Sequence, residues 1–470
     1  MNNKNKQKVI VLGGGISGLT AAWELSKLNK YDIVLCEKEN RLGGLCGYYD
    51  FKGIKLDYGP HKVYSVIPGI MDEFMKISNS TLKTVEKKHK IILRGKLMDY
   101  PVKLVQLVKV FNPIEVIHLS ISVLLTLLRT PFLKEASTYE EYCKNIFGNK
   151  IYQTVFLPLA YKVWGDPKEL SAQIAKKRIP VRNMYDLVFR LLNIKKESKF
   201  TDASHFFYPQ EGFYQVCDGL ANNLLRSGHI IRTCQKPVKF IMEEKRIKTV
   251  VFDNKQAIDC DMLVSSIPLN EVTSLLFPDD RKINQEDNFL KMRHSMIAYF
   301  LIDKPSCLND HWVFCPDKEL VFSRISEQKL ISTKGFPEDK TVICCDFTSE
   351  VKSGLFKKPD GEILALCVKG LEGLKIVNKN QVLDSCLVRI PAFYPVYELG
   401  FQEKKDKIFK ELNSIENIIY TGRLGMSDYY NVDHCLDMAM FIAKNLDAGV
   451  IVPEINRLLH KRAEEYQIVD

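Results

Sequence analysis

The stretch KVIVLGGGISG at residues 8–18 decides the fold of this chain. Residues 8–12 are apolar and rich in β-branched side chains, a pattern typical of a buried parallel strand. Gly13, Gly15 and Gly18 then fall at the G-x-G-x-x-G spacing, and residues 19–28 continue as a predicted helix. Such glycines permit a sharp turn, close approach of the backbone to a pyrophosphate, and tight packing of the helix on the sheet. The pattern predicts a dinucleotide site at a helix N-terminus, where free N–H groups and the helix dipole favour phosphate.

An acidic residue follows at the distance that such a site requires. A second predicted strand, DIVLC at residues 32–36, ends at Glu37, 19 residues beyond Gly18. An acidic side chain at this position hydrogen-bonds a ribose hydroxyl of the dinucleotide. The alternative, a glycine-rich turn without a ligand, does not require the strand, the helix and the acid to occur together. We therefore expect Glu37 to contact the adenosine ribose.

The residues after Glu37 resemble a flavin-binding extension. RLGG follows at residues 41–44, and DYGPH at residues 57–61. The first of these resembles the R-x-G-G extension of the flavin amine oxidase superfamily, which includes protoporphyrinogen oxidase, phytoene desaturases and UDP-galactopyranose mutase; the alternative is a simple turn between two strands. The resemblance implies FAD as the cofactor and a GPH segment that reaches the isoalloxazine. The residues that it places at FAD in this part of the chain are Lys38, Arg41, Gly43, Gly44 and His61.

A second block of similarity lies in the middle of the chain. YKVWG at residues 161–165, followed by LSA at residues 170–172, is similar to the Y-x-K-V-W-G…L-S-A signature of bacterial protoporphyrinogen-oxidase-like or UDP-galactopyranose-mutase-like flavoproteins. The match is inexact, because Tyr161 directly precedes Lys162. Trp164 either lines a pocket or anchors a helix end in the core. We expect Lys162 to be a surface lysine whose aliphatic stem lies along the protein.

Two further segments resemble the same flavoproteins. FYPQEG at residues 207–212 resembles a Y-P-x-x-G segment, and the resemblance places backbone groups near Val238 at the adenine ring. Near the C-terminus, Gly422 and Arg423 precede YYNVDH at residues 429–434, which is similar to a G-R…Y-x-N-x-D-H segment. The resemblance implies that the helix beginning near Val432 lies under the flavin pyrimidine ring, where its N-terminus stabilises negative charge. Asp433 is alternatively a helix cap.

Composition narrows the class of protein. The chain has 470 residues, of which 46% are hydrophobic and 26% are charged, as in globular proteins with more than one core. The glycine-rich strand begins too early for a signal peptide, so none is expected. The 13 cysteines are scattered and form no C-x-x-C pair, which favours reduced thiols in a cytoplasmic protein. Neither a metal site nor a disulfide relay is indicated.

Charge and hydropathy leave the partners open. The net charge of +10 suggests basic residues spread along a solvated surface, with an anionic substrate or an anionic membrane as functional alternatives. No motif supports nucleic-acid binding. Residues 114–128 are the most hydrophobic stretch and are too short to span a bilayer. We expect a buried helix there; the alternative is a helix that lies on a membrane, giving peripheral association. The oligomeric state is left open.

These patterns predict an α/β protein with a Rossmann-type FAD-binding domain and a second α+β substrate domain with a helical subdomain and a mixed or antiparallel sheet. The FAD-binding domain is expected to be discontinuous, formed by residues 1–65, 206–270 and 415–450. Residues 66–205 are expected to form the mostly helical part of the substrate domain, and residues 271–414 its sheet. Residues 451–470 form a C-terminal helix or tail.

The resemblance implies an FAD-dependent oxidoreductase of the protoporphyrinogen oxidase or amine oxidase type, which transfers a hydride from an organic substrate to flavin N5. The alternative is a mutase, similar to UDP-galactopyranose mutase, that isomerises a nucleotide sugar without net redox; Arg389 and Arg423 would then bind the diphosphate. A non-enzymatic flavin-binding protein is a third hypothesis. The candidate catalytic residues are His61, Trp164, Tyr394 and Arg423.

Overall fold

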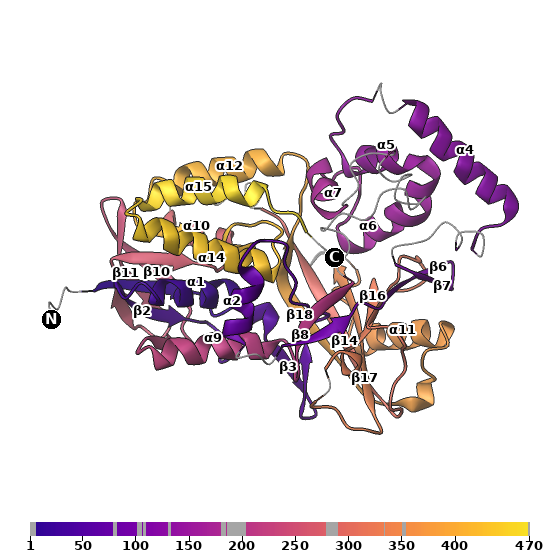
Figure 1. The fold of residues 1–470 in the computed structure, drawn as a ribbon, viewed down its shortest axis with the longest axis horizontal. Helices are drawn as coiled ribbons and strands as arrows, with labels where there is room; N and C mark the ends of the chain where they lie inside the picture. The colour runs from indigo at the N-terminus through magenta and orange to yellow at the C-terminus, as the bar shows by residue number, and fades with distance from the viewer. Residues whose placement is uncertain are drawn as a thin grey trace. The chain divides into compact units, whose positions relative to one another are not determined.

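The computed structural model describes residues 6–78, 82–100, 106, 110–129, 133–179, 185, 204–278, 290–332, 334–349 and 354–468. The chain forms two compact units (Figure 1). Unit 1 consists of Met1–Lys83, Phe207–Leu290 and Gln402–Tyr466, and unit 2 of Thr84–Phe206, Lys291–Phe401 and Gln467–Asp470. The chain passes between the units within β5 (Leu82–Glu86) and β8 (His205–Pro209), and again after Leu290, Phe401 and Tyr466.

Unit 1 contains a five-stranded parallel sheet in the order β19-β13-β1-β2-β9. Its strands are β1 (Gln7–Leu12), β2 (Tyr31–Cys36), β9 (Ile230–Arg232), β13 (Met262–Ser265) and β19 (Ile418–Tyr420). The central strand β1 pairs with β2 and β13, and its residues from Val9 to Leu12 are fully buried. Burial on both faces explains the unbroken apolar run in the sequence.

Helices pack around this sheet. Figure 1 shows α1 (Ile16–Ser26) between α9 (Tyr214–Arg226) and α14 (Val432–Asp447), and α1 contacts both. The first segment of unit 1 extends past the boundary expected at residue 65, because α2 (Ile70–Ile77) packs on α9 and α14. The remaining elements of unit 1 are α10 (Leu269–Leu276), α12 (Phe401–Leu412), α13 (Gly422–Gly425), α15 (Val452–Glu464), the hairpin of β3 (Tyr48–Phe51) and β4 (Ile54–Asp57), and an antiparallel sheet of β10 (Pro237–Glu243), β11 (Arg246–Phe252) and β12 (Ala257–Asp259).

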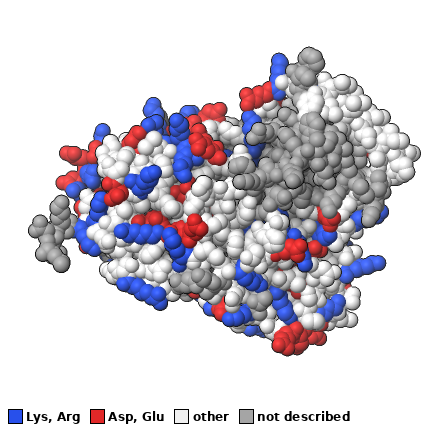
Figure 2. All heavy atoms as spheres, in the orientation of Figure 1, with Lys and Arg blue, Asp and Glu red and all other residues white. Residues whose placement is uncertain are grey.

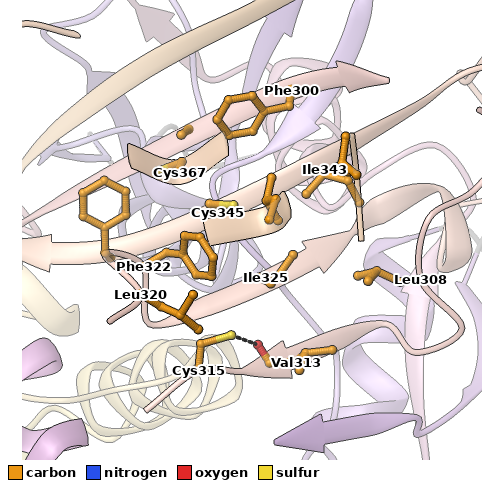
Figure 3. Close-up of a cluster of buried hydrophobic side chains, with 14 of the residues drawn as sticks. Phe300, Leu308, Val313, Cys315, Leu320, Phe322, Ile325, Ile343, Cys345 and Cys367 are labelled. Carbon is orange, nitrogen blue, oxygen red and sulfur yellow. Dashed lines mark hydrogen bonds between the residues drawn. The ribbon is translucent and has the colours of Figure 1, made fainter. Parts of the chain in front are cut away.

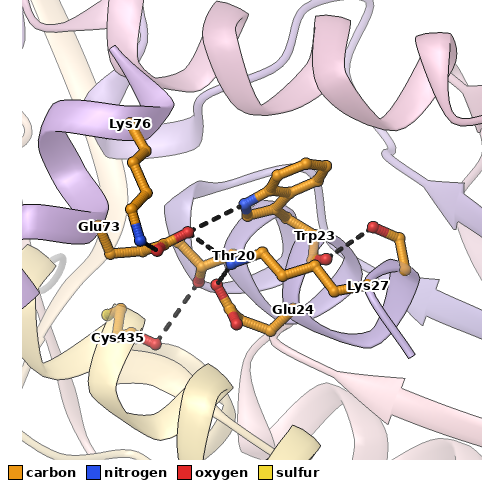
Figure 4. Close-up of polar contacts among 8 residues, drawn as sticks. Thr20, Trp23, Glu24, Lys27, Glu73, Lys76 and Cys435 are labelled. Carbon is orange, nitrogen blue, oxygen red and sulfur yellow. Dashed lines mark hydrogen bonds and ion pairs between the residues drawn. The ribbon is translucent and has the colours of Figure 1, made fainter. Parts of the chain in front are cut away.

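Polar side chains connect these helices (Figure 4). The Lys27 ammonium lies 2.6 Å from Glu24 and 2.5 Å from Glu73 on α2, and the Trp23 indole donates to Glu73 at 3.4 Å. Both carboxylates are buried, so they need this shared cation. The Thr20 hydroxyl lies 3.5 Å from the carbonyl oxygen of Cys435 on α14. These contacts hold α1, the helix of the glycine motif, against its neighbours.

Unit 2 contains a seven-stranded mixed sheet in the order β18-β14-β17-β16-β15-β6-β7. Its strands are β6 (His89–Leu93), β7 (Lys96–Asp99), β14 (Met292–Ile302), β15 (Trp312–Phe314), β16 (Arg324–Glu327), β17 (Thr341–Ser349) and β18 (Val382–Pro395). Neighbouring strands are antiparallel except β15 and β6, which are parallel. Apolar side chains of these strands pack against α11 (Asp360–Gly373) in one core, where Phe300 and Cys345 lie near Cys367 (Figure 3).

The helical part of unit 2 consists of α4 (Pro113–Arg129), α5 (Tyr139–Ile151), a π-helical turn (Tyr152–Phe156), α6 (Leu157–Val163) and α7 (Ala172–Arg178). Helix α5 is kinked at Gly148, where φ is +74°. A Cβ there would lie 2.8 Å from the hydroxyl oxygens of Ser122 and Thr126 on α4, so glycine permits close packing of the two helices. The predicted fold class is confirmed: a Rossmann-type unit is joined to an α+β unit with a helical part and a mixed sheet.

Candidate dinucleotide-binding site

The glycine turn connects β1 to α1 in unit 1. Gly13 has a φ of +100°, and its N–H donates to the carbonyl of Cys36 at 2.8 Å. A Cβ on Gly18 would lie only 1.9 Å from the carbonyl oxygen of Gly13. Protein packing therefore requires glycine at position 18. Gly15 is the N-cap of α1, and a Cβ there would meet no protein atom closer than 3.9 Å.

The open surroundings of Gly15 are what a phosphate cradle requires. Packing within the protein does not demand glycine at this position, whereas close approach of a pyrophosphate to the backbone does. The turn also leaves the first N–H groups of α1 without intrahelical partners. These donors and the positive end of the helix dipole fit the negative charge of a dinucleotide.

The RLGG segment lies directly against the glycine turn. The Gly43 N–H donates to the carbonyl of Gly14 at 2.8 Å, and Gly15 and Gly43 form a parallel β-bridge. Gly44 has a φ of +53°, and a Cβ there would lie 3.2 Å from the Cα of Gly15. The two glycines are therefore part of the same backbone surface as the first motif. Lys38 and Arg41 beside them are exposed, and the Arg41 guanidinium lies 5.1 Å from the centre of the Tyr48 ring.

Glu37 lies at the end of β2, and its carboxylate is buried. One oxygen accepts from the Gly14 N–H at 2.6 Å and the other from the Glu39 N–H at 2.9 Å. Each carboxylate oxygen can accept more than one hydrogen bond, so this arrangement orients Glu37 and leaves acceptor capacity for ribose hydroxyls. Val238 lies three residues after Gln235, whose N–H donates to the backbone carbonyl of Glu37 at 2.8 Å. Val238 coincides with an irregularity in the pairing of β10 and β11.

The C-terminal segment reaches the same turn through α1. Gly422 has a φ of +77°, and a Cβ there would lie 2.1 Å from the hydroxyl oxygen of Ser17. The Ser17 hydroxyl donates in turn to the Cys435 sulfur of α14 at 3.1 Å. Three segments distant in sequence therefore meet around the first turn of α1. A dinucleotide fits the chemistry of this set, which combines free N–H groups, a buried carboxylate and glycines that leave the backbone open.

The first turn of α14 is held by its own side chains. Asn431 is the N-cap of α14, which begins at Val432. Asn431 and His434 form a capping box around this first turn. Asp433 accepts from the Ser65 hydroxyl at 2.9 Å, so it connects the helix to another loop and is not the N-cap. Arg423 donates through Nε and Nη2 to the carbonyl of Tyr430, at 3.0 and 2.8 Å. This arginine fixes the loop that leads into α14.

His61 belongs to a polar cluster with Asp57 and Tyr208, which the sequence motifs alone do not predict. Its Nδ1 lies 3.0 Å from the carbonyl of Gly59 and 3.9 Å from Asp57. Asp57 is buried, and it accepts from the Tyr208 hydroxyl at 2.5 Å and the Phe213 N–H at 3.0 Å. Burial raises the pKa of Asp57 to about 7, against these two hydrogen bonds, which lower it. The sequence contains both parts of this cluster, in the DYGPH and FYPQEG segments. It does not show that the two segments contact each other.

Trp164 and Tyr394, the other candidate catalytic residues, lie in unit 2, whereas His61 and Arg423 lie in unit 1. Trp164 is buried at the end of α6, with its ring 5.6 Å from that of Tyr139. Tyr394 is half-buried in β18 opposite Arg293 of β14. The roles of Trp164 and Tyr394 in catalysis stay predictions.

The expectation of a surface Lys162 is wrong. The ammonium donates to the carbonyls of Cys315, Asp317 and Phe322, at 2.7, 2.5 and 3.1 Å. Burial lowers the pKa of Lys162 to about 8. The three acceptors lie some 150 residues further along the chain, so no local pattern in the sequence indicates them. This lysine fixes α6 to the loop between β15 and β16.

Comparison with known proteins supports the resemblance to the flavin amine oxidase superfamily. Residues 11–74 match the family described as an NAD(P)-binding Rossmann-like domain. The chain is 26% identical over 196 residues to a probable UDP-galactopyranose mutase of Klebsiella pneumoniae, a match that covers 40% of this chain and 47% of that protein. The chain therefore spans about half the length of this curated relative in the match.

Two solved structures share the fold over nearly the whole chain. A reduced UDP-galactopyranose mutase has a TM-score of 0.80 at 18% identity, covering 95% of this chain and 94% of the other. A putative protoporphyrinogen oxidase from Exiguobacterium sp. 255-15 has a TM-score of 0.72 at 16% identity, covering 96% and 100%. The fold is thus shared with a mutase and a putative oxidase, and the fold and the site together support a dinucleotide-binding protein.

Proposed function

We propose that the protein is an FAD-dependent oxidoreductase that oxidises a small organic substrate. The observation that carries the proposal is the meeting of the glycine turn, the RLGG segment and Gly422, the first residue of α13, around the first turn of α1. Glu37 would bind the adenosine ribose, and the turn and the N-terminus of α1 the pyrophosphate. The N-terminus of α14 would face the flavin ring system. FAD supplies the hydride acceptor when it is bound.

The protein's own contribution centres on His61. Because a carbonyl only accepts hydrogen bonds, the contact with Gly59 places a hydrogen on Nδ1 of His61. In the neutral ring Nε2 is then an acceptor, able to orient a substrate N–H or O–H or to receive its proton. Asp57 lies 3.9 Å from Nδ1 and would stabilise the ring if it became protonated. We therefore assign His61 the role of orienting the substrate and accepting its proton.

A mutase is the second candidate, because the curated relative from Klebsiella pneumoniae is a probable UDP-galactopyranose mutase. That function needs cationic groups for a diphosphate, and Arg389 and Arg423 were the expected ones. Arg423 donates twice to the Tyr430 carbonyl, and Arg389 is bound to Asp360 and to the carbonyl of Lys358. Both guanidiniums are thus engaged within the chain, which favours the oxidoreductase.

The test separates the two chemistries on the purified full-length protein. We expect a yellow protein that releases FAD on denaturation, and whose flavin absorbance bleaches on anaerobic mixing with an oxidisable substrate. His61→Ala should reduce the rate of bleaching at least about tenfold and leave the FAD spectrum and affinity unchanged. Turnover of a nucleotide sugar only after reduction with dithionite would instead establish the mutase. A protein that binds no FAD would contradict both functions.

A further inference from the structure

Helix α4 carries a stripe of exposed aliphatic side chains, which we call the α4 stripe. Its members are between 47% and 66% exposed and recur at helical spacing: Ile114, Ile117, Ile121, Leu124, Leu125 and Leu128. The opposite face of the helix is packed, with Leu119 and the partly buried Val116 in a cluster with Ile91, Leu93 and Met98. The helix is therefore apolar on both faces, and only one face has a partner in the described part of unit 2.

The outer face of α4 carries almost no charge. In Figure 2 the surface where Figure 1 places α4 is largely white. The helix has one acid, Glu115, and both of its oxygens lie 2.9 Å from the Arg94 guanidinium. Isolated exposed leucines are normal in proteins, but a continuous stripe over four turns marks a contact surface.

The surrounding sequence is strongly basic. Residues 84–200 contain 21 lysines and arginines and only 10 acids, a net charge of +11, whereas the whole chain has a net charge of +10. The positive charge is therefore not spread along the chain, as expected from its total, but concentrated in the segment that contains α4. An aliphatic stripe within a basic segment is complementary to an anionic lipid surface, whose headgroups attract cations and whose acyl region accepts leucine and isoleucine.

Charge also argues against a second copy on this face, since two such segments would bring like net charges together. The stripe lacks the tryptophan, tyrosine and arginine anchors that dominate protein interfaces. Among the described residues, no helix is long and apolar enough to cross a bilayer. We propose that α4 lies in the plane of an anionic membrane, with the α4 stripe inserted at the boundary between headgroups and acyl chains.

Vesicle sedimentation of the full-length protein tests this proposal. We expect it to pellet with vesicles of phosphatidylcholine and phosphatidylglycerol, and more weakly with phosphatidylcholine alone or at high salt. Leu124→Glu should lower the partition coefficient at least about tenfold, because a carboxylate would enter the apolar layer. Leu225→Glu is the matched control, since Leu225 is 52% exposed on α9 and Leu124 is 57% exposed. Both substitutions add one negative charge, so the control measures the effect of net charge alone. Leu225→Glu should change the partition coefficient less than about twofold.

Insertion has a direct readout that does not depend on binding strength. In a Leu125→Trp variant, the added fluorescence should be quenched by vesicles whose acyl chains carry bromine. Thermal unfolding of each variant checks its fold, and Leu128→Ser repeats the test with a milder change. Failure of the wild type to pellet with anionic vesicles would overturn the proposal, as would equal losses for Leu124→Glu and Leu225→Glu. So would a wild-type dimer in sedimentation velocity that Leu124→Glu converts to a monomer, which would assign the stripe to a second copy.

Discussion

Gly15 and Gly18 stand three residues apart in one turn, but an added methyl group would meet different surroundings at each. At Gly18 it would lie 1.9 Å from a backbone oxygen, and at Gly15 its nearest protein neighbour would be 3.9 Å away. The backbone at Gly15 has a φ of −74°, which alanine adopts without strain. One position thus serves the packing of α1, and the other is open toward a ligand.

This difference predicts that alanine affects stability at position 18 and FAD binding at position 15. Gly18→Ala should destabilise the protein by about 3 kcal/mol or more, because the backbone must move. Gly15→Ala should leave the unfolding midpoint of the FAD-free protein nearly unchanged and weaken FAD binding at least about tenfold. Thermal unfolding and titration with FAD measure the two effects. Unchanged FAD affinity in Gly15→Ala would contradict the assignment of the pyrophosphate to this turn.

The raised pKa of Asp57 predicts a dependence of stability on pH. In the unfolded chain this carboxyl titrates near 4, whereas burial raises its pKa to about 7 in the folded protein. The folded state therefore binds more protons between these values, so Asp57 lowers the free energy of unfolding as pH rises from about 4 to 7. Asparagine cannot ionise and lacks this contribution.

Relative to the wild type, Asp57→Asn should therefore gain stability with rising pH over that interval, by up to ~4 kcal/mol. Denaturant midpoints of both proteins at pH 5 and pH 8 provide the comparison. Asparagine has one side-chain oxygen for the Tyr208 hydroxyl and the Phe213 N–H, which bind two oxygens of Asp57. Asp57→Asn can therefore also lose stability by an amount that is the same at both pH values, and this loss is separate from the pH-dependent gain. A stability difference independent of pH would show that Asp57 ionises normally in the fold.

At the scale of elements, α1 meets α13, which begins at Gly422, by contact between small residues. A Cβ on Gly422 would lie 2.1 Å from the Ser17 hydroxyl oxygen and 2.4 Å from the Ser17 Cβ, and the φ of +77° disfavours any other residue. Close approach of these elements places the loop before α14 beside the first turn of α1. The geometry of the proposed flavin end of the site therefore depends on two small side chains.

Gly422→Ala should be destabilising in two separable parts. In the wild-type background it incurs both the clash with Ser17 and the left-handed backbone, whereas in a Ser17→Gly background only the backbone cost of about 1–2 kcal/mol remains. A double-mutant cycle by denaturant unfolding should therefore show a coupling of at least about 1 kcal/mol. Additive effects would mean that the two segments are further apart than the structure places them.

At the scale of the whole molecule, each unit has its own sheet, and the three tryptophans are divided between the units. Trp23 lies in unit 1, and Trp164 and Trp312 lie in unit 2. Since the proposed FAD site belongs to unit 1, FAD should stabilise that unit by mass action. The fluorescence of Trp23 therefore reports on unit 1, and that of Trp164 and Trp312 on unit 2.

In a variant with Trp164→Phe and Trp312→Phe, the fluorescence of Trp23 reports the unfolding of unit 1. We expect the midpoint of this transition to move to a higher denaturant concentration when FAD is added. The tryptophans of unit 2, observed in Trp23→Phe, should shift less. FAD at a hundredfold excess over its dissociation constant corresponds to about 2.7 kcal/mol of stabilisation. Equal shifts of both probes would indicate that the two units unfold as one cooperative block.

The sequence alone determined the elements whose residues are close together along the chain. The strand, glycine turn, helix and Glu37 of the first motif follow from local spacing, and β1, α1 and β2 lie where that spacing predicts. The hairpin of β6 and β7 follows from the same kind of local pattern, since KIILRGKLMD at residues 90–99 places a strand-like run on each side of the turn at Arg94 and Gly95. In both cases the hydrophobic period and the turn residues belong to one short segment.

Only the tertiary structure decided properties that depend on distant partners. The charge of Lys162 predicts a surface residue, but its ammonium donates to three backbone carbonyls more than 150 residues further along the chain. Asp57 has a raised pKa because distant segments of the chain bury it, against the hydrogen bonds from Tyr208 and Phe213, which lower the pKa. Gly422 is glycine because Ser17 approaches it. Likewise, the hydrophobicity of residues 114–128 predicts a buried helix, whereas α4 buries one face and exposes the other. Burial and contact are properties of the folded chain, because they depend on which segments meet.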